Sequence, residues 1–190
     1  MKRGFILSLL CVFYTATGLA RDLTRGYRGF VEVDGSFGKC DYWNDEKWTY
    51  DKDNLLFLGI ATSHGYQFNP HFYLGAGLML ACAFPTGDMT IPIFADARYD
   101  AHFGRFTPFI DIRGGLYFDG GSECDLYLSP TIGYSFLRSK KLNFNLGAGI
   151  TLRGDKTIKN IVENGQLVAP NVVSHRINTL FTIKFGIDLK

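Results

Sequence analysis

The chain has 190 residues, enough for one domain of ordinary size, and its formal net charge is only +2. This balance argues against a nucleic-acid partner, because nucleic-acid-binding domains usually carry a marked excess of basic residues. Aromatic residues make up 15% of the chain and glycine occurs 22 times, a combination that points to an exported β-protein.

The first twenty residues have the pattern of a secretory signal peptide. Two basic residues precede an apolar run from Phe5 to Tyr14, and small residues follow up to Ala20. The apolar run is shorter than the roughly 20 residues that a helix needs to span a bilayer. We therefore expect residues 1–20 to be a signal peptide and residues 21–190 to form one mature domain.

Eight segments of the mature chain alternate apolar and polar residues with the period of two that is typical of β-strands. In the first segment, Val31 and Val33 share one face with other apolar residues, whereas Glu32 and Asp34 share the opposite face. In chain order the predicted strands are Tyr27–Phe37, Leu55–Phe68, Phe72–Phe84, Ile91–Phe103, Pro108–Phe118, Leu126–Phe136, Leu142–Leu152 and Ile177–Leu189. Each predicted strand has one apolar face and one largely polar face.

Two of these strands share a glycine motif, "FYLGAGLML" in the third and "FNLGAGITL" in the seventh. Read with a period of two, each motif splits into an unbroken apolar row and a second row that contains two glycines. The glycines are Gly75 and Gly77 in the third strand, and Gly147 and Gly149 in the seventh. Together with bulky aromatic residues on the same faces, they predict the mixture of small and large side chains that fills a narrow barrel.

The alternation fits two architectures. A soluble lipocalin-like barrel turns its apolar faces inward, whereas a membrane barrel turns them outward to lipid. Two further features favour the membrane barrel. The predicted strands are about 10 to 13 residues long, which suits tilted membrane-spanning strands better than the ~5–6 residues of ordinary strands. The connections alternate between short turns and longer loops, of which Lys39–Asp53 and Gly154–His175 are the longest.

The sequence therefore predicts an all-β fold: a transmembrane, eight-stranded, antiparallel up-and-down β-barrel. Its presumed interior faces carry charges, which need partners because an unpaired buried ion is very costly. We predict an interior salt-bridge network whose members are Arg28, Glu32, Asp96, Arg98, Asp111, Arg113, Lys184 and Asp188.

Two registers pair these charges across neighbouring strands. A tight turn at 103–106 would set Arg98 opposite Asp111, and the same register sets Asp96 opposite Arg113. One antiparallel register between the first and last strands would likewise set Glu32 opposite Lys184. It also sets Arg28 opposite Asp188. An ion or proton path is the functional interpretation of this network, but an eight-stranded barrel is so narrow that we expect a packed plug.

The polar residues suggest no enzyme. Ser63 and His64 fall on opposite faces of one strand, so they cannot act as nucleophile and base. The other histidines, His71, His102 and His175, show neither triad nor metal-ligand spacing. We expect no catalytic residues, no cofactor and no metal.

The first long loop gathers aromatic residues with charged ones. Exposed aromatics of this kind suit contact with a ligand or a protein, or else they lie at the membrane interface. The candidate contact residues are Tyr42, Trp43, Trp48 and Tyr50. Cys40 in the same loop and Cys124 in the third external loop are candidates for a disulfide on the external face.

The chain resembles the small eight-stranded outer-membrane barrels of the OmpX and OmpA membrane-domain type. The residues that carry this resemblance are "GYQFNPHFYLGAGL" at Gly65–Leu78 and "IPIFADARYD" at Ile91–Asp100, which look like the barrel proteins common in Bacteroides-type bacteria. The final "FTIKFGIDLK" is similar to the terminal assembly signal of such barrels, except that it ends in Lys190 rather than an aromatic residue.

The resemblance implies a protein of the Gram-negative outer membrane. Its expected partners are outer-membrane lipid and lipopolysaccharide, the barrel-insertion machinery, and an extracellular protein or host ligand. We expect a structural or surface-interaction role through the external loops. The alternatives are a lipid-modifying or small-solute transport barrel, and a soluble lipocalin-like binder.

Overall fold

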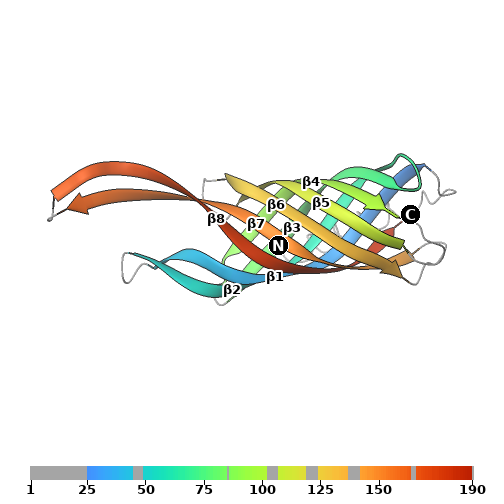
Figure 1. The fold of residues 1–190 in the computed structure, drawn as a ribbon, viewed down its shortest axis with the longest axis horizontal. Helices are drawn as coiled ribbons and strands as arrows, with labels where there is room; N and C mark the ends of the chain where they lie inside the picture. Colours follow the sequence, from blue (N-terminus) through green and yellow to red (C-terminus); the bar gives the residue numbers. More distant parts are fainter. Residues whose placement is uncertain are drawn as a thin grey trace, which may run out of the picture.

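In the part of the chain that it describes, the computed structural model contains eight β-strands that form one closed barrel (Figure 1). The strands are β1 (Gly26–Asn44), β2 (Thr49–Gln67), β3 (Phe72–Phe84), β4 (Met89–Asp100), β5 (Thr107–Phe118), β6 (Cys124–Phe136), β7 (Leu142–Glu163) and β8 (Gln166–Leu189). The structure describes residues 25–44, 49–84, 86–101, 107–118, 124–136, 142–163 and 166–189. The predicted signal peptide, residues 1–20, lies outside this range.

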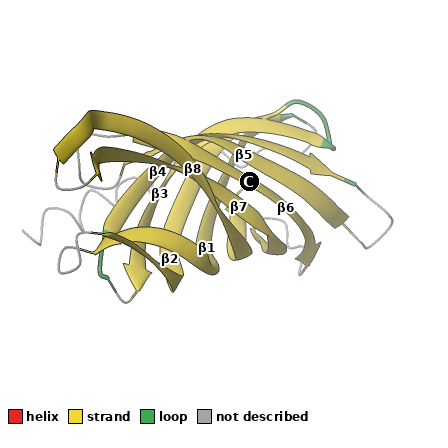
Figure 2. Cartoon of the chain, turned by 60° about the vertical axis from the view of Figure 1, so that its left-hand side comes forward, coloured by secondary structure: helices red, strands yellow, loops and turns green. Residues whose placement is uncertain are grey.

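Each strand pairs antiparallel with the next in the chain, and β1 pairs with β8 to close the barrel. Every element drawn as regular structure in Figure 2 is a strand. In the part of the chain that the structure describes, no helix is long and apolar enough to cross a membrane. The predicted all-β, eight-stranded, antiparallel up-and-down barrel is thereby confirmed.

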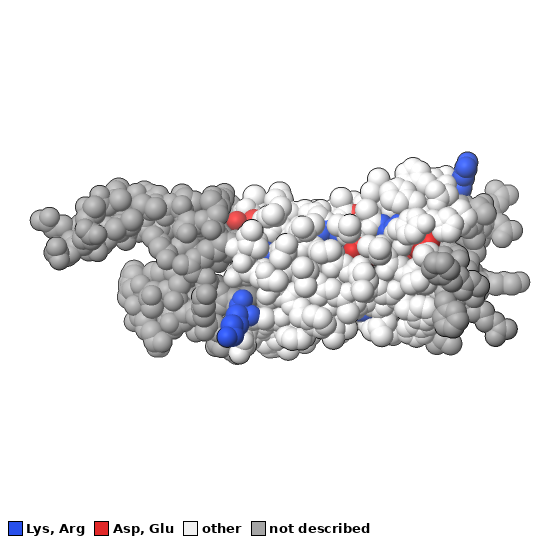
Figure 3. All heavy atoms as spheres, in the orientation of Figure 1, with Lys and Arg blue, Asp and Glu red and all other residues white. Residues whose placement is uncertain are grey.

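The two faces of the sheet differ sharply in exposure. On β4 the outward Ile93 is 53% exposed, whereas the inward neighbours Phe94 and Asp96 are 2% and 1% exposed. The same alternation runs along the other strands, so large apolar side chains are exposed while charged ones are buried. Most of the described surface in Figure 3 is accordingly neither acidic nor basic. This distribution is the reverse of a soluble lipocalin-like barrel and matches a barrel that faces lipid.

The inward glycines allow neighbouring strands and side chains to approach closely. A Cβ atom at Gly75 would collide with the ring of Tyr73, and one at Gly77 would collide with the Thr62 carbonyl and the Phe94 ring. The prediction of a crowded interior at Gly75 and Gly77 therefore agrees with the structure. In the seventh strand only Gly149 is crowded to this degree, because a Cβ atom at Gly147 would lie 3.5 Å from its nearest neighbours.

Two strand pairs extend well beyond the barrel wall. β1 and β2 remain paired up to Asn44 and Thr49, and β7 and β8 up to Glu163 and Gln166. Both hairpins project at the left of Figure 1. The prediction of long loops at Lys39–Asp53 and Gly154–His175 is therefore wrong, because backbone pairing continues where the apolar and polar alternation has stopped.

The β4–β5 register is the one that the sequence predicts. Asp96 lies opposite Arg113, and Arg98 lies opposite Asp111. A short turn fixes the register of a hairpin, which explains why the charge pattern identifies it.

The predicted closing register is wrong by two residues. Glu32 lies opposite Gly186 instead of Lys184, and Lys184 lies opposite Asp34. Asp188 lies opposite Phe30 instead of Arg28. A two-residue shift keeps every side chain on its predicted face, so the face assignment survives the error.

Candidate functional site: the charged barrel interior

The barrel interior is filled by three groups of side chains, which we name by position. The turn end of the barrel is the end that contains the β2–β3 turn at 68–71, and the hairpin end is the opposite one. Between them the interior divides into a turn-end layer, a middle layer and a hairpin-end layer.

Arg28 organises the turn-end layer. Its guanidinium donates to both carboxylate oxygens of Asp188, with Nη2 2.6 Å from Oδ2, and it also contacts the carboxylate of Asp100. Nη1 donates to Oε1 of Gln67 at 2.7 Å, and Asn143 donates to Asp188 at 3.2 Å. All these side chains are buried, so the ion pairs are shielded from solvent.

Arg98 shares the Asp100 carboxylate with Arg28. Its Nε lies 2.8 Å from Oδ1 of Asp100, and its Nη2 donates to Ser135 and Asn145 at 2.9 Å each. Asp100 therefore bridges two buried arginines from different strands. Removing this carboxylate would leave Arg98 with neutral hydrogen-bond partners only.

Aromatic rings separate the two arginines of the turn-end layer. The Cζ of Arg28 lies 4.7 Å from the ring centre of Phe30, and that of Arg98 lies 4.8 Å from the same ring. Arg98 also lies 3.6 Å from the ring centre of Phe109, and Phe30 packs edge-on against Tyr73 at 5.1 Å. The layer is thus a stack of alternating cations and rings, an arrangement that is favourable for both.

The middle layer contains more carboxylates than cations. Its charged members are Glu32, Asp34, Asp96, Asp111, Arg113 and Lys184.

Arg113 is the centre of the middle layer. It contacts Glu32 across the lumen, and its Nε lies 3.6 Å from Asp96 and 3.4 Å from Asp111. Lys184 reaches Asp111 at 3.3 Å. These contacts join β1, β4, β5 and β8 through the interior of the barrel.

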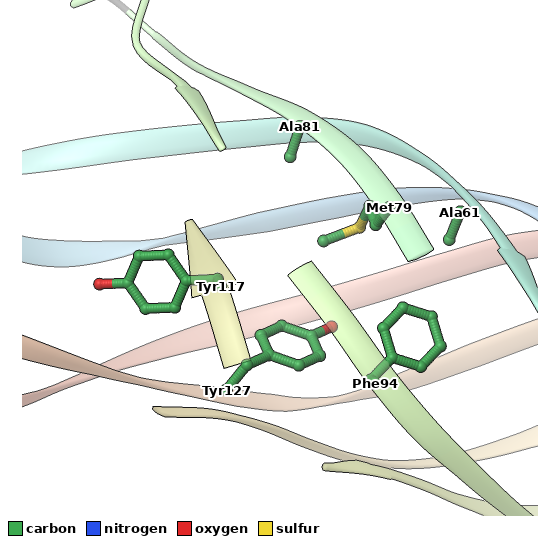
Figure 4. Close-up of a cluster of buried hydrophobic side chains, with 6 residues drawn as sticks. All are labelled: Ala61, Met79, Ala81, Phe94, Tyr117 and Tyr127. Atoms are coloured by element: carbon green, nitrogen blue, oxygen red, sulfur yellow. The ribbon is translucent and has the colours of Figure 1, made fainter. Parts of the chain in front are cut away.

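The hairpin-end layer is mainly apolar. Figure 4 shows its six-residue cluster, whose members are Ala61, Met79, Ala81, Phe94, Tyr117 and Tyr127. A second cluster joins Leu55, Phe57, Ala83 and Leu180. Arg153 lies between the two groups, with Cζ 4.2 Å from the ring centres of Phe57 and Tyr117.

This geometry can be compared with known proteins. No protein-family model matches the chain, and no curated protein sequence matches it significantly. Among solved structures, Neisserial surface protein A (NspA) aligns with a TM-score of 0.56 at 12% sequence identity, over 87% of this chain and 98% of NspA. The chain has the fold of a small outer-membrane β-barrel.

A second structural neighbour of the barrel is the outer membrane protein OprG from Pseudomonas aeruginosa. It aligns with a TM-score of 0.49 at 11% identity, over 87% of this chain and 96% of OprG. At such identities the likeness concerns the fold of the barrel.

The eight residues of the predicted interior network are all buried inside the barrel. Two of the four expected pairs do not form. Arg98 lies opposite Asp111 but bonds to Asp100, and Glu32 contacts Arg113 across the lumen instead of Lys184. The other two expected pairs form. Arg113 lies 3.6 Å from Asp96, which is directly opposite it, and Arg28 pairs with Asp188 in spite of the shifted register, because the long arginine side chain reaches diagonally.

Several interior residues of the site escaped the sequence analysis. Phe30, Tyr73 and Phe109 complete the cation and ring stack, and Gln67 and Asn145 serve as neutral partners of the arginines. Strand alternation places each of them on the inward face. Their convergence could not be read from the sequence, because it depends on the spacing across the barrel.

The predicted contact residues belong to the β1–β2 hairpin. Tyr42 pairs with Asp51 and Trp43 pairs with Tyr50, so three of the four lie in strands rather than in a loop. Trp48 lies outside the described residues, as do the side chains of the other three.

The predicted disulfide does not form in the structure. Cys124 is an exposed free cysteine at the start of β6. Cys40 belongs to β1, which pairs only with β2 and β8, so the two strands lie apart around the barrel. Sequence position alone could not reveal this separation.

Ser63 and His64 point to opposite faces, as alternation predicts. Ser63 is buried beside the hydroxyl of Tyr73, whereas His64 hydrogen-bonds to Tyr27 and Thr62. Among the described residues, no group of three or more His, Cys, Asp or Glu side chains is arranged to hold a metal ion.

Proposed function

We propose that the chain is an integral protein of the Gram-negative outer membrane, with a plugged interior and a surface-interaction role carried by its two projecting hairpins. The turn end would face the periplasm and the hairpin end the exterior, in keeping with the short inner and long outer connections of such barrels. The proposal includes no enzymatic activity and no cofactor. Its lipid partners would contact the outward apolar faces.

The observation that carries the plugged interior is the turn-end layer. Two arginines, two carboxylates and three aromatic rings are buried in contact with one another inside the barrel at this level. An eight-stranded barrel has room for little beyond such side chains. The middle and hairpin-end layers add two further obstacles to solute passage.

Planar-bilayer recording of the purified barrel tests the plug. We expect no steady conductance on the scale of larger porins. A stable nanosiemens channel from folded, heat-modifiable protein would contradict the plug and favour the small-solute transport function.

The surface-interaction role rests on the position of the hairpins. Because β8 pairs with β1, the β7–β8 and β1–β2 hairpins rise from adjacent parts of the rim. The other two connections at this end, between β3 and β4 and between β5 and β6, are short. One side of the rim therefore projects far beyond the other and offers a large surface to a partner.

Trypsin treatment of intact cells tests the orientation that this role requires. Lys156 and Lys159 lie in the projecting part of β7, and Lys52 lies in the projecting part of β2, opposite Asp41 on β1. We expect cleavage at these sites in intact cells. Cleavage only after the outer membrane is permeabilised would mean that the hairpins face the periplasm and would overturn the surface role.

A further inference from the structure

Among the side chains that the structure describes, His64 belongs to a polar cluster on the outward face that the plugged interior and the hairpins do not explain. The side chain of His64 hydrogen-bonds through Nδ1 to the Tyr27 hydroxyl at 2.5 Å and through Nε2 to the Thr62 hydroxyl at 2.9 Å. Its cross-strand neighbours on the outward face are small or aliphatic, with Ala76 directly opposite on β3. Ionisable groups among lipid-facing side chains are costly and generally have a function.

The local strand geometry brings these three residues together. Thr62 and His64 are two residues apart on β2, so both project outward. Gly29 lies directly opposite His64 on β1 and leaves room for the imidazole ring to lean across to Tyr27. A Cβ atom at Gly29 would lie 3.0 Å from the Tyr27 hydroxyl oxygen and 3.1 Å from Nδ1 of His64. The missing side chain at this position is what permits the cluster.

The cluster lies near the turn end, at the level where aromatic side chains gather. The ring centres of Tyr66 and Phe68 lie 5.2 Å apart, and those of Phe68 and Phe72 lie 5.8 Å apart. These three rings are on the outward face and are 39% to 47% exposed. Aromatic residues of this kind mark the level of lipid headgroups in membrane proteins.

The hydrogen bonds of the cluster determine which ligand it suits. The negative charge of a bound phosphodiester favours the imidazole that carries protons on both nitrogens. This ring donates to both hydroxyl oxygens and has no proton left for any other acceptor. The hydroxyl hydrogens of Tyr27 and Thr62 must then point away from the ring. The result is one positive charge between two outward O–H donors, which matches the two free oxygens and single negative charge of a phosphodiester.

We propose that Tyr27, Thr62 and His64 bind the phosphodiester group of a phospholipid in the periplasmic leaflet. The inference rests on the membrane placement in the proposed function. The two acyl chains of the lipid would lie along the apolar outward faces of β1, β2 and β3, where Leu74 and Leu78 are 44% and 51% exposed.

Native mass spectrometry of the folded barrel in a non-ionic detergent tests this site. Phosphatidylglycerol is the probe, and diacylglycerol with the same chains is the phosphate-free comparison. We expect wild-type protein to retain phosphatidylglycerol and not diacylglycerol. The variants Tyr27→Phe and Thr62→Val each remove one O–H donor at nearly constant shape and should weaken retention about tenfold, as loss of a charge-assisted hydrogen bond implies.

Tyr99→Phe is the matched control. Tyr99 is an outward tyrosine at the same end of the barrel, on β4, and is 50% exposed. Its hydroxyl is outside the cluster, so this variant should retain lipid as the wild type does. Gly29→Ala keeps all three polar groups but crowds them, and it should weaken retention as well.

Three outcomes would overturn the lipid site. Equal retention by wild type, Tyr27→Phe and Thr62→Val would show that the cluster binds no headgroup. Equal retention of diacylglycerol would show that the chains alone hold the lipid, and full displacement by inorganic phosphate would assign the site to a soluble anion. Each variant must first show the heat-modifiable band of a folded barrel, so that lost retention is not caused by misfolding. Failure of the wild-type protein to insert into a bilayer would contradict the membrane placement instead.

Discussion

Replacing Asp100 with asparagine should strongly destabilise the barrel. Asp100 is 2% exposed, and its carboxylate contacts Arg28 through one oxygen and Arg98 through the other. Asparagine has nearly the same shape but no charge. The variant therefore tests the ion pairs themselves and leaves the packing of the turn-end layer almost unchanged.

The magnitude follows from the partners that remain. Arg28 keeps Asp188 at 2.6 Å, but Arg98 keeps only Ser135, Asn145 and its ring contacts. Removing one partner of a buried ion pair costs about 3–5 kcal/mol, because the other charge is left uncompensated. We expect Asp100→Asn to lower the free energy of unfolding by this amount, with most of the loss arising at Arg98.

Urea unfolding in lipid vesicles, followed by circular dichroism and by the heat-modifiable gel band, measures the effect. Asp88→Asn in the exposed β3–β4 turn is the control, and it should change stability by less than about 0.5 kcal/mol. The double variant Arg98→Met, Asp100→Asn should recover part of the loss, because it removes the uncompensated charge. A loss below about 1 kcal/mol for Asp100→Asn, or no recovery in the double variant, would refute this account.

Three other perturbations test the interior and the rim. Gly75→Ala should destabilise the barrel by ~1–3 kcal/mol in the same assay, because the added Cβ atom would collide with the Tyr73 ring. Gly147→Ala should leave stability nearly unchanged, because its Cβ atom would lie at ordinary contact distance. Equal losses of stability in the two variants would refute the packing argument. The double variant Phe30→Ala, Phe109→Ala removes two of the three rings of the turn-end layer and should raise planar-bilayer conductance above that of wild type, with Phe118→Ala on the outward face as the control. Cys124 should react with a maleimide in the folded, unreduced protein, because its thiol is exposed. If mass spectrometry finds that Cys124 reacts only after reductant is added, the result would support the predicted disulfide.

The inward and outward faces of the barrel wall could be predicted, because the alternation of side chains along a strand is a local property. Whether Ile93 faces lipid and Phe94 the interior depends only on their neighbours in the chain, and the structure agrees at both. The β4–β5 register could be predicted for a similar reason, since only a short stretch of chain separates the end of β4 at Asp100 from the start of β5 at Thr107.

The hairpins and the ion partners could not be predicted in the same way. Beyond the apolar belt both faces of a strand can be polar, so nothing in the sequence around Trp43 distinguishes a paired strand from a loop. The contact between Glu32 on β1 and Arg113 on β5 crosses the lumen and depends on the diameter of the barrel, which no short stretch of sequence encodes.

The closing register shows what the interior charges contribute to the fold. A register shift of one residue between β1 and β8 would place every charged side chain of one strand on the lipid-facing side. The alternation of apolar and polar residues therefore excludes such a shift. A shift by two keeps all faces correct, and only the interior contacts can distinguish it. In the observed register Glu32 lies beside Gly186, whose missing side chain provides the space through which Glu32 reaches Arg113. In the register two residues away Glu32 would lie beside Lys184, where no such space exists. Several registers between β1 and β8 would keep the charged side chains inside. The contacts among these side chains therefore select the register that forms, in addition to filling the barrel.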